Sequence, residues 1–167
     1  MKVQGNPRNA VRDVVIAEYS PVEDSFEIVR EKHVGGDATF AVTFEDRKGA
    51  QRQGVFGLRV HRGGAWQRSG GFMGSAHLTG DRDVWQTWGG WGGGSGERAV
   101  FGGWVAIPTA VSARATDAMQ GRILEDVVED GVVLFMYKGE FGLDNARLEL
   151  LDAEGRILRT GPMHRRP

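Results

Sequence analysis

The residues best suited to recognition or chemistry lie in a tryptophan- and glycine-rich stretch from Val84 to Trp104. It holds four of the five tryptophans, and Trp85, Trp88 and Trp91 recur every three residues. Indole rings beside glycines can stack on sugars, bases or a protein partner, because glycine lets a ligand approach the backbone closely. The same rings could instead anchor a flexible connection by packing into the core. We name Trp85, Trp88 and Trp91 as candidate ligand- or partner-binding residues and expect Trp104 in the core.

The histidines and neighbouring aspartates form no recognisable metal motif. The four histidines are His33, His61, His77 and His164. No pair has the i, i+4 or H-x-H spacing of a metal site. Asp81 and Asp83 resemble the start of a calcium loop, but the remaining loop ligands are missing. An enzyme with a site built from His61, His77, Asp81 and Asp83 is therefore only a third hypothesis, and we predict no metal.

Other catalytic signatures are also missing from the sequence. None of the serines near glycines completes the G-x-S-x-G pattern of serine hydrolases,. The segment "GSGERA" fits G-x-G-x-x-A, but no strand leads into it and a strand follows it, so a dinucleotide site is not predicted. The chain has no cysteine, which excludes disulfides, thiolate metal sites and cysteine nucleophiles,. We therefore predict no catalytic residue and no cofactor.

The densest acidic segment is "LEDVVEDG", with Glu125, Asp126, Glu129 and Asp130. Paired carboxylates can hydrolyse glycosides when they face each other across a cleft. Asp130-Gly131 is, however, a strong hairpin signal, and charges beside a turn are usually solvated. We predict a structural turn whose carboxylates mostly face the solvent.

Length and charge narrow the class of protein. The 167 residues are enough for one domain, or for two small β modules packed together,. The 21 basic residues are balanced by 22 acidic ones, whereas nucleic-acid binders usually carry a basic excess,. The sequence shows neither a secretory leader nor an apolar run of roughly 20 residues that could cross a bilayer. We predict a cytoplasmic protein that binds neither nucleic acid nor membrane.

The N-terminal part predicts an antiparallel meander. In "DATFAVTFED" the apolar residues from Ala38 to Phe44 alternate with Thr39, Thr43 and Glu45,. "GVFGLRVHR" repeats this alternation after a turn, "SFEIVREKHV" precedes it, and "GGAWQRSGGF" follows with Trp66 on a short strand,. Because the alternate positions are polar, we expect one face of this sheet to be solvated.

The segment from Arg8 to Tyr19 carries conflicting signals. Asn6 followed by Pro7 suits the start of a helix,. The β-branched residues of "DVVIAEY" favour a strand instead. We favour the strand and leave a short N-terminal helix as the alternative.

The C-terminal part predicts a sandwich. Short strand-like runs are separated by turns at "AMQG", "EDG", "LDN" and "AEG", and such regular spacing is typical of a β-sandwich. "VVLFMY" is apolar on both faces and therefore indicates a central strand,. Pro108 is expected at a junction between strands, where its missing N–H is tolerated.

The sequence "FGGWVAIPTAVSARATDAMQGRILEDVVEDGVVLFMYKG", followed by "RLELLDAEGRIL", resembles a recurring immunoglobulin-like domain of uncharacterised actinobacterial proteins. The shared features are a strand ending at a proline corner, a "V-x-A/V-R" segment, a "dG-V-F/L" strand and a closing "L-x-D-A-x-G-R-I/V-L" hairpin. The resemblance runs from residue 101 to the C-terminus. It implies an immunoglobulin-like fold and transfers no catalytic residue.

Together these patterns predict a mainly β protein. We expect an antiparallel meander over residues 1–80, a Gly/Trp-rich connection over 81–98, and an immunoglobulin-like β-sandwich over 99–167. The preferred function is a non-catalytic module that binds a protein partner through a sheet face, a strand edge or the Gly/Trp stretch. The alternative is a binder of a small molecule or carbohydrate through the same tryptophans. Exposed strand edges would also allow a homodimer.

Overall fold

The computed structural model describes residues 5–76, 85–92 and 98–163, and for 85–92 it describes only the strand and its pairing. The helix is α1 (Pro7–Tyr19). The strands are β1 (Glu27–Val34), β2 (Asp37–Glu45), β3 (Gln51–Val60), β4 (Trp66–Ser75), β5 (Trp85–Gly92), β6 (Arg98–Val105), β7 (Ser112–Asp117), β8 (Arg122–Val127), β9 (Val132–Lys138), β10 (Arg147–Leu151) and β11 (Ile157–Pro162). A short 3-10 helix, η1 (Leu143–Asn145), precedes β10.

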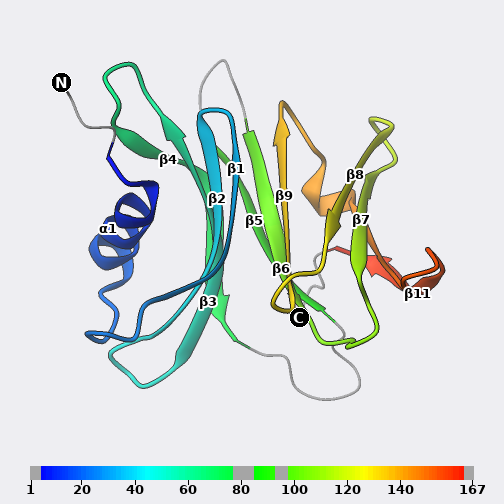
Figure 1. The fold of residues 1–167 in the computed structure, drawn as a ribbon, viewed down its shortest axis with the longest axis horizontal. Coiled ribbons are helices and arrows are strands. Elements are labelled where there is room, and N and C mark those ends of the chain that lie inside the picture. Colours follow the sequence, from blue (N-terminus) through cyan, green and yellow to red (C-terminus); the bar gives the residue numbers. More distant parts are fainter. Residues whose placement is uncertain (1–4, 77–84, 93–97, 164–167) are drawn as a thin grey trace.

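The strands form three antiparallel sheets. The N-terminal sheet has the order β1-β2-β3-β4, the middle sheet β5-β6-β9 and the C-terminal sheet β11-β10-β7-β8. Figure 1 shows them as successive layers, with α1 on the outer side of the N-terminal sheet. The predicted mainly β, sandwich-like class is confirmed, with one short helix at the N-terminus.

Helix α1 replaces the strand that we favoured for residues 8–19. The Asn6 side chain caps the helix by accepting a hydrogen bond of 2.9 Å from the Arg8 N–H, and Pro7 occupies the first turn,. Val11 and Val15 are fully buried, and their i, i+4 spacing places them on one helix face against the N-terminal sheet,. Their burial on that sheet outweighs the strand preference of the β-branched residues.

One face of the N-terminal sheet packs against α1, and it carries the apolar residues that the alternation predicted to share one face. Phe40, Phe44, Phe56 and Leu58 point into this core and are at most 1% exposed. Aromatic side chains bury the most apolar area per residue, so these positions supply much of the stability of this layer.

The prediction that the other face of this sheet is solvated is wrong. Thr39 is fully buried, and its hydroxyl lies 3.8 Å from the Met136 sulfur on β9. Ala41 and Val55 on the same face pack against Val100 of the middle sheet. A period-two pattern with threonine on one face cannot reveal that a second sheet covers that face.

Gly57 on β3 allows these two sheets to approach closely. A Cβ atom at this position would lie 2.5 Å from Val100 Cγ2 and 3.0 Å from Ser69 Oγ. Such contacts are shorter than van der Waals separation, so a side chain here would push the sheets apart. Gly57 therefore has a packing role between layers.

Strands β6 and β9 of the middle sheet have buried residues on both faces. On β9, Val132 and Leu134 face the N-terminal sheet, whereas Val133 and Phe135 face the C-terminal sheet. The prediction that "VVLFMY" is a central strand is wrong, because β9 forms an edge of its three-stranded sheet, although residues on both of its faces are buried. Burial on both faces results from stacking of layers and does not require a central position within a sheet.

Residues 85–92, which we predicted as part of a connection, form strand β5. Trp85 pairs with Val105, Trp88 with Gly102, and Trp91 with Ala99 of β6. The candidate tryptophans are thus placed on a strand of the middle sheet, and their side chains lie outside the described residues. The boundary that we predicted between residues 98 and 99 therefore separates β5 from nearly all of β6, although these two strands are hydrogen-bonded to each other.

The turn predicted at Asp130-Gly131 is confirmed. Asp130 has φ 53° and Gly131 has φ 71°, as the two central residues of a type I′ turn require,. Glu129 and Val132 close it with reciprocal backbone hydrogen bonds of 3.0 and 2.9 Å. Pro108 lies in a turn after β6, as predicted.

Candidate functional site

The structure does not assemble the predicted candidate residues into a site. His77, Asp81, Asp83 and His164 lie outside the described residues. His33 and His61 are both exposed, and His33 Nε2 lies 3.7 Å from Glu31. Within the described part of the chain, no group of three His, Asp or Glu side chains could hold a metal ion.

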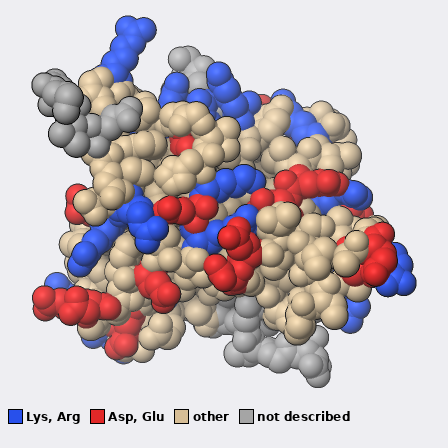
Figure 2. Space-filling model, viewed as in Figure 1, with Lys and Arg blue, Asp and Glu red and all other residues tan. Residues whose placement is uncertain are grey.

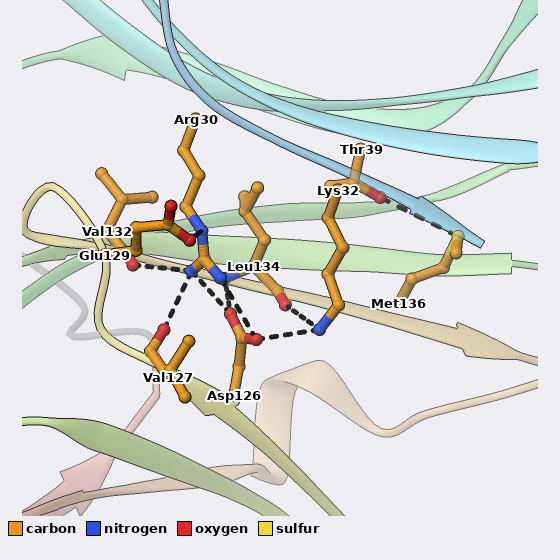
Figure 3. Close-up of polar contacts among 9 residues, drawn as sticks. All are labelled: Arg30, Lys32, Thr39, Asp126, Val127, Glu129, Val132, Leu134 and Met136. Atoms are coloured by element: carbon orange, nitrogen blue, oxygen red, sulfur yellow. Dashed lines mark hydrogen bonds and ion pairs between the residues drawn. The ribbon is translucent and has the colours of Figure 1, made fainter.

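A group of charges built around the buried pair Arg30 and Asp126, here called the Arg30–Asp126 cluster, joins the N-terminal sheet to β8 and β9 (Figure 3). It consists of Arg30, Lys32, Asp126 and Glu129. Arg30 Nη1 lies 2.7 Å from Asp126 Oδ2, and Lys32 Nζ lies 2.8 Å from Asp126 Oδ1. Arg30 Nε also lies 3.3 Å from Glu129 Oε2 at the exposed end of the cluster.

Backbone groups form further hydrogen bonds with this cluster. Arg30 Nη1 donates to the carbonyl oxygens of Val127 at 2.9 Å and Val132 at 2.8 Å. The Leu134 N–H donates to Asp126 Oδ2 at 2.8 Å. The side chains of Arg30 and Asp126 are only 7% and 5% exposed, so the pair is closed to a ligand. We interpret the cluster as structural.

The prediction that the carboxylates of "LEDVVEDG" mostly face the solvent is confirmed for Glu125, Glu129 and Asp130, which are exposed, whereas Asp126 is buried. Along β8, Ile123, Glu125 and Val127 are exposed, while Asp126 is buried on the opposite face. The sequence of β8 does not show which face is buried, because each face carries both apolar and charged residues. The partner of Asp126, Arg30, is 96 residues away and could not be identified from the sequence.

The cluster makes stability depend on pH. Burial opposes ionisation of Asp126, but hydrogen bonds from Lys32, the Leu134 N–H and Arg30 hold the pKa of this carboxyl below its usual value. The associated stability is present above the unfolded-state pKa of about 3.9 and is lost as the pH falls through the lower folded-state pKa. We expect the free energy of unfolding to decrease below about pH 4, and an Asp126→Asn variant to show a smaller slope there. Equal slopes in an acid series of urea titrations would contradict this assignment.

A second feature, the Tyr19 pocket, lies where the end of α1 meets the N-terminal sheet. Its volume is about 250 Å3, it is partly open to solvent, and it is lined by Tyr19, Phe44, Asp46, Arg52, Met73 and Gly74. Figure 1 shows the end of α1 beside the hairpin that connects β2 and β3. Residues from α1, β2, β3 and β4 therefore contribute to one concave surface.

The β2–β3 hairpin fixes the polar side of this pocket. Asp46 Oδ1 accepts hydrogen bonds from the N–H groups of Lys48 at 2.8 Å and Ala50 at 3.0 Å, which holds the turn,. Asp46 Oδ2 lies 2.8 Å from Arg52 Nε and 2.7 Å from Arg52 Nη2. Arg52 Nη1 donates to Ser75 Oγ at 2.7 Å, so the guanidinium is held between hairpin and β4.

The opposite side of the pocket is aromatic and carries the Tyr19 phenol. The Tyr19 ring centroid lies 6.1 Å from that of Phe44 and 6.1 Å from that of Phe56. Burial raises the pKa of Tyr19, and the nearby Arg68 and Glu18 act in opposite directions on it. Tyr19 is therefore an uncharged hydrogen-bond donor or acceptor at neutral pH.

A third feature is the outer face of the C-terminal sheet, here called the aliphatic face. Ile123, Val127 and Ile157 are 61%, 56% and 52% exposed on strands β8 and β11. Between these strands, Arg114 lies 2.7 Å from Glu125 and 3.3 Å from Glu149. The strand register places all these residues on one face, on which no described element packs.

Basic and acidic side chains are interspersed over the surface drawn in Figure 2, and no extended basic stripe is seen on that face. No described helix has both the length and the apolar character that crossing a membrane requires. No known protein family, curated protein or solved structure matches this chain. The immunoglobulin-like resemblance of residues 101–167 therefore stays a prediction.

Proposed function

We propose that this chain is a non-catalytic binding protein that holds a small molecule in the Tyr19 pocket. The observation that carries the proposal is a concave site of about 250 Å3 that combines an aromatic wall with a fixed guanidinium. Ligand sites typically pair apolar walls with a few polar groups that set orientation. The Tyr19 pocket has this composition, with Phe44 and Met73 as its apolar part and Arg52 as its polar part.

The dimensions of the pocket limit the ligand to a small molecule. An apolar cavity of about 150 Å3 is sufficient for benzene. The larger Tyr19 pocket can therefore accommodate one ring with a short substituent, or a branched aliphatic group of similar size. A carbohydrate chain or a nucleotide would exceed it.

The non-catalytic assignment is supported by the hydrogen bonding of Asp46, the carboxylate that lines the pocket. The Asp46 carboxylate accepts hydrogen bonds from two backbone N–H groups and from Arg52. A backbone bond from Ala50 and the side-chain bond from Arg52 hold the pKa of Asp46 below its usual value. Such a carboxylate is a weak general base, because catalytic bases work best with a pKa near the working pH.

A thermal-shift series with acetophenone tests this proposal. At a ligand concentration ten times the dissociation constant, binding adds about 1.4 kcal/mol to stability. For a chain of this size each kcal/mol raises Tm by about 2–4 °C. We expect a concentration-dependent rise in Tm, which is reduced in a Met73→Phe variant that narrows the pocket.

A Met119→Phe variant is the matched control, because Met119 is exposed and lies between β7 and β8, outside the pocket. It should respond to acetophenone as the wild type does. If neither acetophenone nor other single-ring compounds raise the Tm of the wild type, the proposed function is wrong.

The aliphatic face favours a second candidate, self-association of two copies of the chain. It carries exposed Glu125 on β8 and exposed Arg147 on β10, two strands apart. In a twofold interface each copy can place its Glu125 opposite the partner's Arg147, since contacts occur in reciprocal pairs. Ile123 and Val127 would then supply the apolar contact area,.

Sedimentation velocity over a concentration series tests this second candidate. We expect a dimer in the wild type and a monomer in an Ile123→Asp variant. Ile16→Asp is the control, because Ile16 is also exposed but lies on α1, away from the aliphatic face. A wild type that stays monomeric at all concentrations would exclude the dimer.

A further inference from the structure

The charges around the Tyr19 pocket are already neutralised within the protein. Arg52 is paired with Asp46 through two nitrogen atoms at 2.8 and 2.7 Å. Beside Tyr19, Arg68 is paired with Glu18. Asp46 and Arg52 thus line the pocket as one neutral pair, and Arg68 and Glu18 form a second neutral pair beside Tyr19, so neither sign is left in excess among these groups.

A charged ligand would therefore find no compensating charge. Transferring an ion from water to a partly buried site costs several kcal/mol unless a partner of opposite charge is present. A carboxylate placed beside Arg52 would also lie near Asp46, which the lowered pKa keeps ionised. An ammonium group would meet Arg52 itself. Both kinds of ion are disfavoured.

The pocket nevertheless offers hydrogen-bond donors. The guanidinium of Arg52 carries five N–H groups, and its contacts with Asp46 and Ser75 engage three of them,. The Tyr19 hydroxyl is instead engaged by the side chains of Glu18 and Arg68. The remaining N–H groups of Arg52 match a ligand oxygen that accepts hydrogen bonds, such as a carbonyl or a hydroxyl oxygen.

We infer that the Tyr19 pocket selects an uncharged ligand that joins a single-ring or short branched apolar body to one hydrogen-bond acceptor, as in a ketone, ester or alcohol. Phe44 and Met73 contact the apolar body, while Arg52 donates to the acceptor. This inference rests on the proposed function and adds the chemical class of the ligand.

Four single-ring probes of similar size distinguish binding of a small molecule from selection for an uncharged ligand with a hydrogen-bond acceptor. They are acetophenone, toluene, benzoate and benzylamine, and their dissociation constants can be measured by isothermal titration calorimetry at neutral pH. We expect acetophenone to bind roughly threefold to tenfold more tightly than toluene, the usual gain from one net hydrogen bond. Benzoate and benzylamine should bind at least about tenfold more weakly than acetophenone.

The outcomes are distinguishable. If benzoate or benzylamine binds as tightly as acetophenone, the inferred selection for uncharged ligands is wrong while small-molecule binding stands. If toluene binds as tightly as acetophenone, the pocket is purely apolar and the inferred acceptor is wrong. If none of the four probes binds, the proposed function itself fails.

Discussion

Replacing Asp126 with alanine is expected to lower the free energy of unfolding by about 3–5 kcal/mol. The substitution leaves Arg30 buried, with its side chain only 7% exposed, and removes the carboxylate 2.7 Å from its Nη1. It also removes the acceptor of the Leu134 N–H and of Lys32 Nζ. An unpaired buried charge is among the largest single destabilising effects in proteins, and urea denaturation measures it directly.

The neighbouring residue supplies the control for this substitution. Glu125 also forms an ion pair, with Arg114 at 2.7 Å, but its side chain is 57% exposed. Glu125→Ala should therefore cost at most about 1 kcal/mol. The double variant Arg30→Met/Asp126→Leu should recover much of the loss, because it removes both buried charges. Equal costs for Asp126→Ala and Glu125→Ala would contradict the role assigned to the Arg30–Asp126 cluster.

The second large effect is expected for Phe101→Ala, at about 3–5 kcal/mol. Phe101 is fully buried between the middle and C-terminal sheets. Its ring centroid lies 5.1 Å from that of Phe135 and 4.9 Å from that of Phe141. Truncation would remove both ring contacts and leave a cavity that strands from two sheets cannot readily close.

Phe72→Ala is the matched control for the loss of a phenyl ring. Phe72 lies on β4 and is 61% exposed. We expect its truncation to change the free energy of unfolding by no more than about 0.5 kcal/mol, as is usual for surface positions. A Phe101→Ala variant as stable as Phe72→Ala would mean that the two sheets do not share the core described above.

Much of the β-structure could be predicted from local patterns. Alternation identified the helix-facing side of β2 and β3, and Asp130-Gly131 identified a hairpin turn. The stacking of three sheets could not be predicted, because period-two patterns report which residues share a face and not what covers that face. Thr39 shows the limit, since a polar residue at an expected solvated position is fully buried.

The Tyr19 pocket could not be predicted for a related reason. Its lining residues come from α1, β2, β3 and β4, and none of them belongs to a recognisable motif. Tyr19 in addition belongs to the segment that we predicted as a strand. Asp46 and Arg52 flank the "RKGAQ" turn, so their proximity could have been expected from the hairpin alone.

Methionine-methyl NMR tests most directly whether a ligand enters the Tyr19 pocket. With 13C-labelled methionine methyl groups, acetophenone should shift the Met73 resonance, because Met73 lines the pocket. The Met119 resonance should not move, since Met119 is 81% exposed and lies outside it. Saturable movement of Met73 alone is the predicted result. An unmoved Met73 resonance, or equal movement of both, would contradict binding in this pocket.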